Sequence, residues 1–194
     1  VLLPGSRRAE IRANLPGMLQ VARELRAQHS ELRTVVAHVN AKRRDLLTAL
    51  VGQQPGAAAE LAIGPLGPWL GGARLVLAKS GTGSLEACLH GAPTVVVYQL
   101  RGPLASLGYH TILSVPWIAA ANLVSNRTIV PEFCFHRQAG WQRVATAVQS
   151  LWHEGPARRQ MLADLDQLRQ RLGAPGASQR TAAVVRACLG LEAS

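Results

Sequence analysis

Apolar positions along the chain alternate between short β-rich runs and longer segments with helical spacing. The β-rich runs predict strands at residues 1–3, 34–39, 61–63, 75–78 and 94–98. Between them, apolar residues at helical spacing predict helices at 11–25, 42–51, 68–71 and 85–90. Beyond the last strand, further helices are expected at 141–152, 157–172 and 178–189. Strands that alternate with helices indicate a parallel sheet with right-handed crossovers.

The composition is that of one folded, basic domain. Of the 194 residues, 48% are hydrophobic and 16% are charged, so burial can offset the entropy of ordering the chain. The net charge is +10, but residues 51–100 are neutral, which places the basic residues at the periphery and predicts anionic partners. Because the arginines are dispersed over amphipathic helices and aromatic residues are few, an anionic membrane surface fits better than nucleic acid.

Several chemistries find no support in the sequence. The three cysteines, Cys88, Cys134 and Cys188, are too widely spaced for a disulfide framework or a metal site, which favours a reducing cytoplasm. The six histidines show no metal-ligand spacing, and no nucleophile motif of a covalent hydrolase is present. No apolar run is long enough to span a membrane. Because Val1 directly begins a strand-like run, we expect that an amino-terminal part precedes it.

The first candidate site follows the first strand, at Pro4-Gly5-Ser6-Arg7. A glycine turn that opens a helix directs backbone N–H groups and the positive end of the helix dipole at one point. Arg7 adds a bidentate phosphate donor, so the motif indicates an anion site. An ordinary strand-to-helix turn with solvated Arg7 and Arg8 explains the same pattern equally well.

The second candidate site is the small-residue turn 80–84, followed by Glu86. Small residues let the backbone approach a ligand, and a carboxylate one turn into the helix can accept hydrogen bonds from a ribose diol. Both turns lie at the carboxyl ends of strands, so one diphosphate could lie between two helix N-termini. The spacing is neither a Walker loop nor a full G-x-G-x-x-G fingerprint, and a simple helix cap is an equal alternative.

The third candidate lies in the segment 101–135, which has no clear periodicity. Within it, residues 122–132 are interpreted as a polar loop, and Asn122 and Arg127 could reach the ligand space. A loop of this size equally often carries solvated side chains. The assignment of this loop therefore stays open at this point.

Taken together, these residues resemble the lipid-A-disaccharide synthases. Four motifs in register carry the resemblance: Leu2-Leu3-Pro4-Gly5-Ser6-Arg7 with Glu10-Ile11, Val39-Asn40-Ala41-Lys42-Arg43-Arg44, Ser80-Gly81-Thr82 with Leu85-Glu86, and Asn122-Leu123 with Arg127 and Val130-Pro131-Glu132. Their order and spacing match the carboxyl-terminal half of that family over all 194 residues.

The resemblance implies an α/β fold: a Rossmann-like parallel sheet with helices on both faces, the donor-binding half of a GT-B glycosyltransferase. Residues 1–136 would form the UDP-sugar-binding domain, and 137–194 the carboxyl-terminal helices, packed on that domain or exchanged between protomers. The amino-terminal acceptor domain of the family would be missing. A homodimer is left open.

The reaction implied is an inverting transfer of diacylglucosamine from UDP-2,3-diacylglucosamine to lipid X. It forms the β(1→6) lipid A disaccharide, releases UDP and uses no metal or cofactor. The family implies a bacterial enzyme that is cytoplasmic and peripheral on the inner face of the inner membrane. Because the family's base lies in the acceptor domain, this chain alone is expected to be inactive.

Site roles follow from the resemblance position by position. Binding of the UDP donor falls to Gly5, Ser6, Arg7, Ser80, Gly81, Thr82 and Glu86. Catalytic roles fall to Arg7, Asn122 and Arg127.

The chain departs from the family pattern at several positions. Lys79 replaces a small residue, Ala121 a proline and Asn126 a glycine, and residues 101–116 follow the pattern poorly. Two alternatives therefore stay open: another UDP-sugar transferase or epimerase, and a non-catalytic Rossmann-like interaction module.

Overall fold

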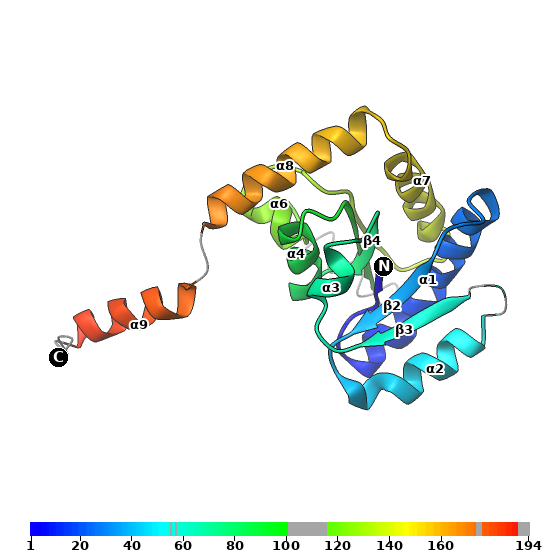
Figure 1. Ribbon diagram of the computed structural model, residues 1–194, viewed down its shortest axis with the longest axis horizontal. Helices are drawn as coiled ribbons and strands as arrows, with labels where there is room; N and C mark the ends of the chain where they lie inside the picture. Colours follow the sequence, from blue (N-terminus) through cyan, green and yellow to red (C-terminus); the bar gives the residue numbers. More distant parts are fainter. Residues whose placement is uncertain (55, 57, 101–115, 174–175, 190–194) are drawn as a thin grey trace.

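Six parallel strands form one sheet in the order β3-β2-β1-β4-β5-β6 (Figure 1). The computed structural model describes residues 1–54, 56, 58–100, 116–173 and 176–189. The strands are β1 (Leu2–Leu3), β2 (Thr34–His38), β3 (Ala59–Ile63), β4 (Val76–Lys79), β5 (Thr94–Gln99) and β6 (Glu132–Phe135). The order runs outward in one direction from β1 and in the other from β4, as in Rossmann-like folds. The expected α/β fold class is confirmed.

Helices connect the strands and cover both faces of the sheet. Their bounds are α1 (Arg8–Gln28), η1 (Ala41–Arg43), α2 (Arg44–Gly52), α3 (Gly67–Leu70), α4 (Thr82–Leu89), α6 (Ala120–Ser125), α7 (Gly140–Trp152), α8 (Pro156–Leu172) and α9 (Ala177–Cys188). None of these described helices combines the length and the apolar character that a membrane span requires.

Side chains of the strands alternate between two cores. Leu2 and Leu77 pack with α1, α2 and α7, whereas Leu3 and Ala78 pack with α3 and α4. This alternation follows from the two-residue period of a strand. Consequently the helix after β1 and the helix after β4 lie on opposite faces, although β1 and β4 are hydrogen-bonded neighbours.

The helices beyond β6 differ in how they pack. Trp141 of α7 and Leu165 of α8 are fully or almost fully buried in the core that α1 helps to form. By contrast, α9 buries none of its residues, and Figure 1 shows it extending away from the sheet. The division at 136/137 and the exchange of the last helices between protomers stay predictions.

Most strands and helices expected from the pattern are confirmed, with two corrections. Helix α4 begins at Thr82 rather than at residue 85, because the Ser84 hydroxyl caps Gly81 by accepting from its N–H and donating to its carbonyl oxygen. The interpretation of 122–132 as a loop is wrong: α6 ends at Ser125, and Glu132 opens β6, which pairs with β5. Residues 101–115 lie outside the described part of the chain.

Candidate functional site

A cavity of about 360 Å³ lies where the strand order diverges, at the carboxyl ends of β1 and β4. All seven residues that the sequence assigned to donor binding line it: Gly5, Ser6, Arg7, Ser80, Gly81, Thr82 and Glu86. The fold thus brings together two turns that are far apart in the sequence. Such a crevice is where open α/β sheets bind ligands.

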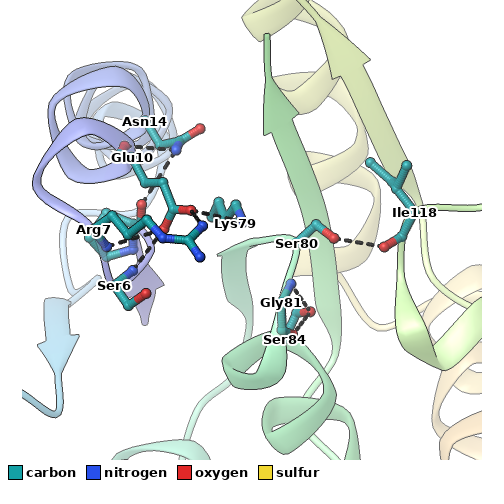
Figure 2. A network of polar contacts seen from close by, with 10 residues as sticks. Ser6, Arg7, Glu10, Asn14, Lys79, Ser80, Gly81, Ser84 and Ile118 are labelled. Carbon is teal, nitrogen blue, oxygen red and sulfur yellow. Dashed lines mark hydrogen bonds and ion pairs between the residues drawn. The ribbon is translucent and has the colours of Figure 1, made fainter. Parts of the chain in front are cut away.

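The turn before α1 is closed by a carboxylate from its own helix (Figure 2). Glu10 Oε2 accepts hydrogen bonds from the backbone N–H groups of Ser6 at 3.0 Å and Arg7 at 3.2 Å. Gly5 permits this approach, since its φ is +105° and a Cβ there would lie 2.8 Å from Glu10 Oε2. The N–H groups expected to bind an external anion therefore already hold an internal one.

Two cations contact the other oxygen of the same carboxylate. Arg7 Nη1 lies 3.1 Å and Lys79 Nζ 3.3 Å from Glu10 Oε1. Burial raises the pKa of Glu10, but the Arg7 and Ser6 N–H groups and the Lys79 ammonium outweigh it and hold that pKa below its ordinary value. Glu10 is therefore ionised at neutral pH and joins the end of β4 to the start of α1.

The start of α4 retains unused donors. Among the described residues, the backbone N–H groups of Thr82 and Gly83 have no hydrogen-bond acceptor. These groups belong to the first turn of the helix, where the dipole favours negative charge. The N–H groups of Arg8 and Ala9 at the start of α1 also have no acceptor among the described residues, but these two residues do not line the cavity. Helix α4 is thus the one that offers free N–H groups of lining residues to an anion.

Glu86 lies one turn into α4 and is half-buried. No ion pair or hydrogen bond of its carboxylate with another described residue is present. Both oxygens can therefore accept hydrogen bonds, as a pair of vicinal hydroxyl groups requires.

Asn122 lies outside the cavity lining and is fully buried. Its Nδ2 donates to the Val130 carbonyl and to Glu132 Oε2, and its Oδ1 accepts from the N–H groups of Ile129 and Val130. These four bonds use the full hydrogen-bonding capacity of an amide side chain. In this structure Asn122 joins α6 to the segment that leads into β6.

A chain of contacts nevertheless connects Asn122 to the cavity. Glu132 accepts from Asn122 and also from the N–H groups of Ile118 and Ala119, at 2.8–3.2 Å. The Ile118 carbonyl in turn accepts from Ser80 Oγ at 2.7 Å (Figure 2). Asn122 is therefore placed to position the Ser80 turn through two intermediates.

Arg127 also lies outside the cavity lining. Its guanidinium forms a bidentate pair with Asp164 of α8, at 2.7 and 3.0 Å, and donates to Gln167. The hydrogen bonds from Arg127 lower the pKa of Asp164, whose side chain is only 4% exposed. Arg127 thus attaches the α6–β6 connection to α8.

Three titratable residues that line the cavity, Glu10, His38 and Lys79, received no role from the sequence. Glu10 stands three residues after Arg7, which is the spacing of the carboxylate in a capping box. Lys79 is the one charged residue of β4, and a charge at the end of an apolar run could have indicated a functional position. His38 is buried at the end of β2, where burial lowers its pKa and Nδ1 accepts from the Asn40 N–H.

A larger cavity, about 730 Å³, lies at the opposite end of the sheet beside His29, Arg74 and Trp152. It borders the residues before β2 and after α7 rather than the turns that open α1 and α4. Among the described residues, no group of three or more His, Cys, Asp or Glu side chains could hold a metal ion. Open α/β sheets bind ligands at the carboxyl ends of their strands, so the cavity of about 360 Å³ between β1 and β4, named here the switch-point cavity, is the better candidate site.

The strand order and the cavity at its point of divergence define a Rossmann-like ligand-binding domain. A family model described as lipid-A-disaccharide synthetase matches residues 1–187, and the chain belongs to this family. The resemblance drawn from the four motifs is thereby confirmed.

Relatives with the name lipid-A-disaccharide synthase agree with this assignment. The relatives from Anaeromyxobacter dehalogenans (strain 2CP-C) and Myxococcus xanthus are each 34% identical to this chain over 93% of its length. The matched part is 47% of the first relative and 46% of the second. The one from Acidobacterium capsulatum is 33% identical over 91% of this chain and 46% of its own length. The chain thus spans about half the length of the curated relatives it matches.

The Arg127–Asp164 pair makes a testable contribution to stability. At pH 7, Arg127→Met should lower the free energy of unfolding by about 1–2 kcal/mol, because it leaves a buried carboxylate without its cation. The folded-state pKa of Asp164 is lowered, so this contribution is present above the ordinary aspartate pKa and is lost as pH falls through the lowered value. Urea denaturation of both proteins should therefore give a difference that shrinks below about pH 4.

Arg169→Met is the matched control, because Arg169 pairs with Asp166 on the same helix at 3.5 Å and both side chains are about half exposed. It should cost less than about 0.5 kcal/mol at pH 7. Equal losses in the two variants, or a loss in Arg127→Met that does not change with pH, would contradict this account.

Proposed function

We propose that this chain binds the nucleotide part of a UDP-sugar donor in the cavity between α1 and α4, as the donor-binding half of a lipid-A-disaccharide synthase. The single observation that carries the proposal is the convergence of all seven predicted donor-binding residues on one cavity, in a chain that belongs to this family. Each residue type there suits a part of UDP.

The diphosphate would lie at the start of α4. The free N–H groups of Thr82 and Gly83 and the positive end of the dipole provide the first contacts. The Arg7 side chain is 82% exposed at the cavity, so its guanidinium can turn to the phosphates. Glu86, one turn further along α4, would accept hydrogen bonds from the ribose hydroxyl groups.

The complete reaction requires more than this chain provides. The 6-hydroxyl oxygen of lipid X attacks C1 of the donor glucosamine, and the bond from C1 to the β-phosphate oxygen breaks, so that UDP leaves with the electron pair. The hydroxyl proton must pass to a base. Glu86 is assigned to the ribose, and Glu10 already accepts from four donor groups. Neither carboxylate among the described lining residues is therefore available, and the resemblance places the family's base in the acceptor domain. We assign the base to that part of the enzyme.

The catalytic roles assigned to Asn122 and Arg127 from the resemblance stay predictions. The contacts of Asn122 favour an indirect role, in which the amide holds Glu132, and Glu132 holds the segment that accepts from Ser80. Arg127 would act by fixing the connection between α6 and β6 to α8 through Asp164.

We also place the protein on the inner face of the bacterial inner membrane as a peripheral enzyme. Its net charge of +10 would attract an anionic phospholipid surface, and the proposed donor and acceptor both carry acyl chains. A homodimer stays a prediction.

Calorimetric titration of the isolated chain with UDP and with uridine tests the site. Arg7→Ala should weaken UDP about tenfold and leave uridine unchanged, because a charge-assisted bond to phosphate is lost. Glu86→Ala should weaken both ligands by a similar factor, because both contain the ribose. The different effects of the two variants on uridine affinity distinguish the phosphate contact from the ribose contact.

Arg12→Ala is the charge-matched control, since Arg12 is exposed on α1 and does not line the cavity. It should bind UDP as the unmodified chain does. Absence of UDP binding at millimolar concentration, or equal affinity in all variants, would refute the donor site and favour the non-catalytic module.

Flotation with phospholipid vesicles tests the membrane proposal. The chain should bind vesicles that contain phosphatidylglycerol at low ionic strength and dissociate near 1 M salt, where the Debye length falls to about 3 Å. Binding that is insensitive to salt, or no binding, would contradict the proposal. Tight, salt-sensitive binding to DNA instead would favour a nucleic-acid partner.

A further inference from the structure

We infer that Lys79 is a phosphate-binding residue that gives the site its preference for a nucleoside diphosphate over a monophosphate. The inference rests on the proposed function, namely that the switch-point cavity binds a nucleotide. It concerns a residue that none of the four motifs includes.

The position of Lys79 is fixed by the fold. It is the last residue of β4, directly before the Ser80-Gly81 turn that opens α4. Its side chain is 17% exposed, lies 3.3 Å from Glu10 Oε1 and places Nζ 5.0 Å from the centre of the Tyr98 ring (Figure 2 shows the contact with Glu10). The ammonium is thus held between two partners, so little conformational entropy remains to be lost when a ligand binds.

Lys79 borders two cavities. One is the switch-point cavity, and the other, of about 300 Å³, is lined by Ala9, Glu10, Tyr98 and neighbouring residues. Of the residues that the structure describes, only Glu10 and Lys79 belong to the lining of both. A ligand that extends from the first cavity towards the second would pass the Glu10–Lys79 pair.

The local charge favours an anion at this point. Glu10 carries one negative charge, whereas Arg7 and Lys79 together carry two positive charges, and both contact the same oxygen atom. The group therefore has an excess of one positive charge before a ligand binds. Glu86 carries the remaining negative charge of the lining and lies one turn into α4.

The two phosphates of a nucleoside diphosphate match two separate groups of donors. The free N–H groups of Thr82 and Gly83 suit one phosphate, as proposed above. The Lys79 ammonium, a compact charge with three donors, suits the next phosphate along the ligand. A monophosphate can satisfy only the first group, so the contribution of Lys79 appears only with the second phosphate.

Calorimetry with UDP, UMP and uridine tests the inference on the variant Lys79→Met. This variant keeps an unbranched side chain, one heavy atom shorter, and removes the charge. We expect UDP affinity to fall about tenfold, while UMP and uridine change less than twofold. Lys79→Arg should retain most of the UDP affinity. Lys42→Met is the matched control, because Lys42 is the only other lysine in the sequence, is exposed and does not line the cavity.

The outcomes separate the two proposals. If UDP does not bind the unmodified chain, the proposed function fails. The inference is overturned if UDP binds and Lys79→Met leaves the affinity for UDP unchanged. It is also overturned if Lys79→Met weakens the binding of UDP and UMP equally, because Lys79 then does not bind the second phosphate.

A second measurement keeps the inference testable if Lys79→Met does not fold. In the unmodified chain, acetylation by acetic anhydride can be followed at both lysines by mass spectrometry. Saturating UDP should slow acetylation of Lys79 several-fold and leave Lys42 unaffected, whereas UMP should protect neither. Equal protection of Lys79 by UMP and UDP, or no protection by UDP, would overturn the inference.

Discussion

The pairing of β1 with β4 is the constraint on which the site depends. Leu2 pairs with Leu77 and Leu3 with Ala78, so the two strands end within one residue of each other at the same edge of the sheet. From there the chain continues to α1 on one face and to α4 on the other. The turns that follow the strands must therefore separate, and the space between them is the cavity. A strand of two residues suffices because its neighbours on both sides, β2 and β4, fix its register.

The two helix N-termini at the cavity differ in how their backbone N–H groups are used. Glu10 neutralises the start of α1 by occupying the Ser6 and Arg7 N–H groups, and this carboxylate also orders two cations at the rim. The start of α4 has only the Ser84 hydroxyl as a cap, so its Thr82 and Gly83 N–H groups stay available among the described residues. A carboxylate of the protein at one terminus and open donors at the other would orient an anionic ligand along the cavity.

The sequence predicted the parts of the site that depend on local pattern. Buried strands have continuous apolar runs, and the glycine turns after β1 and β4 are read directly from small residues next to those runs. The parts that depend on distant contacts were not predicted. Strand β6 forms because it pairs with β5, a contact between distant parts of the chain. The start of α6 is fixed by Glu132, whose carboxylate accepts hydrogen bonds from the N–H groups of Ile118 and Ala119.

The contacts of the individual side chains follow the same rule. Asn122 and Arg127 stand out in the sequence as polar residues. Only the fold shows that the Asn122 amide is saturated by the segment that leads into β6 and by Glu132, and that Arg127 is paired with Asp164. The Lys79–Glu10 pair joins the end of β4 to the first turn of α1, two positions that a one-dimensional pattern cannot place together. Local periodicity therefore fixes the scaffold, while the electrostatics of the site arise from tertiary contacts.

The central claim is that an anionic ligand binds the start of α4 while Glu10 remains on the start of α1. Amide chemical shifts of the ¹⁵N-labelled chain, followed during titration with UDP and with uridine as the control, test this claim most directly. UDP should shift the Thr82 and Gly83 amide resonances strongly, uridine should shift them much less, and the Ser6 amide should change little with either. A large shift at Ser6 with none at Thr82 and Gly83 would show that the phosphate displaces Glu10 and would contradict the account.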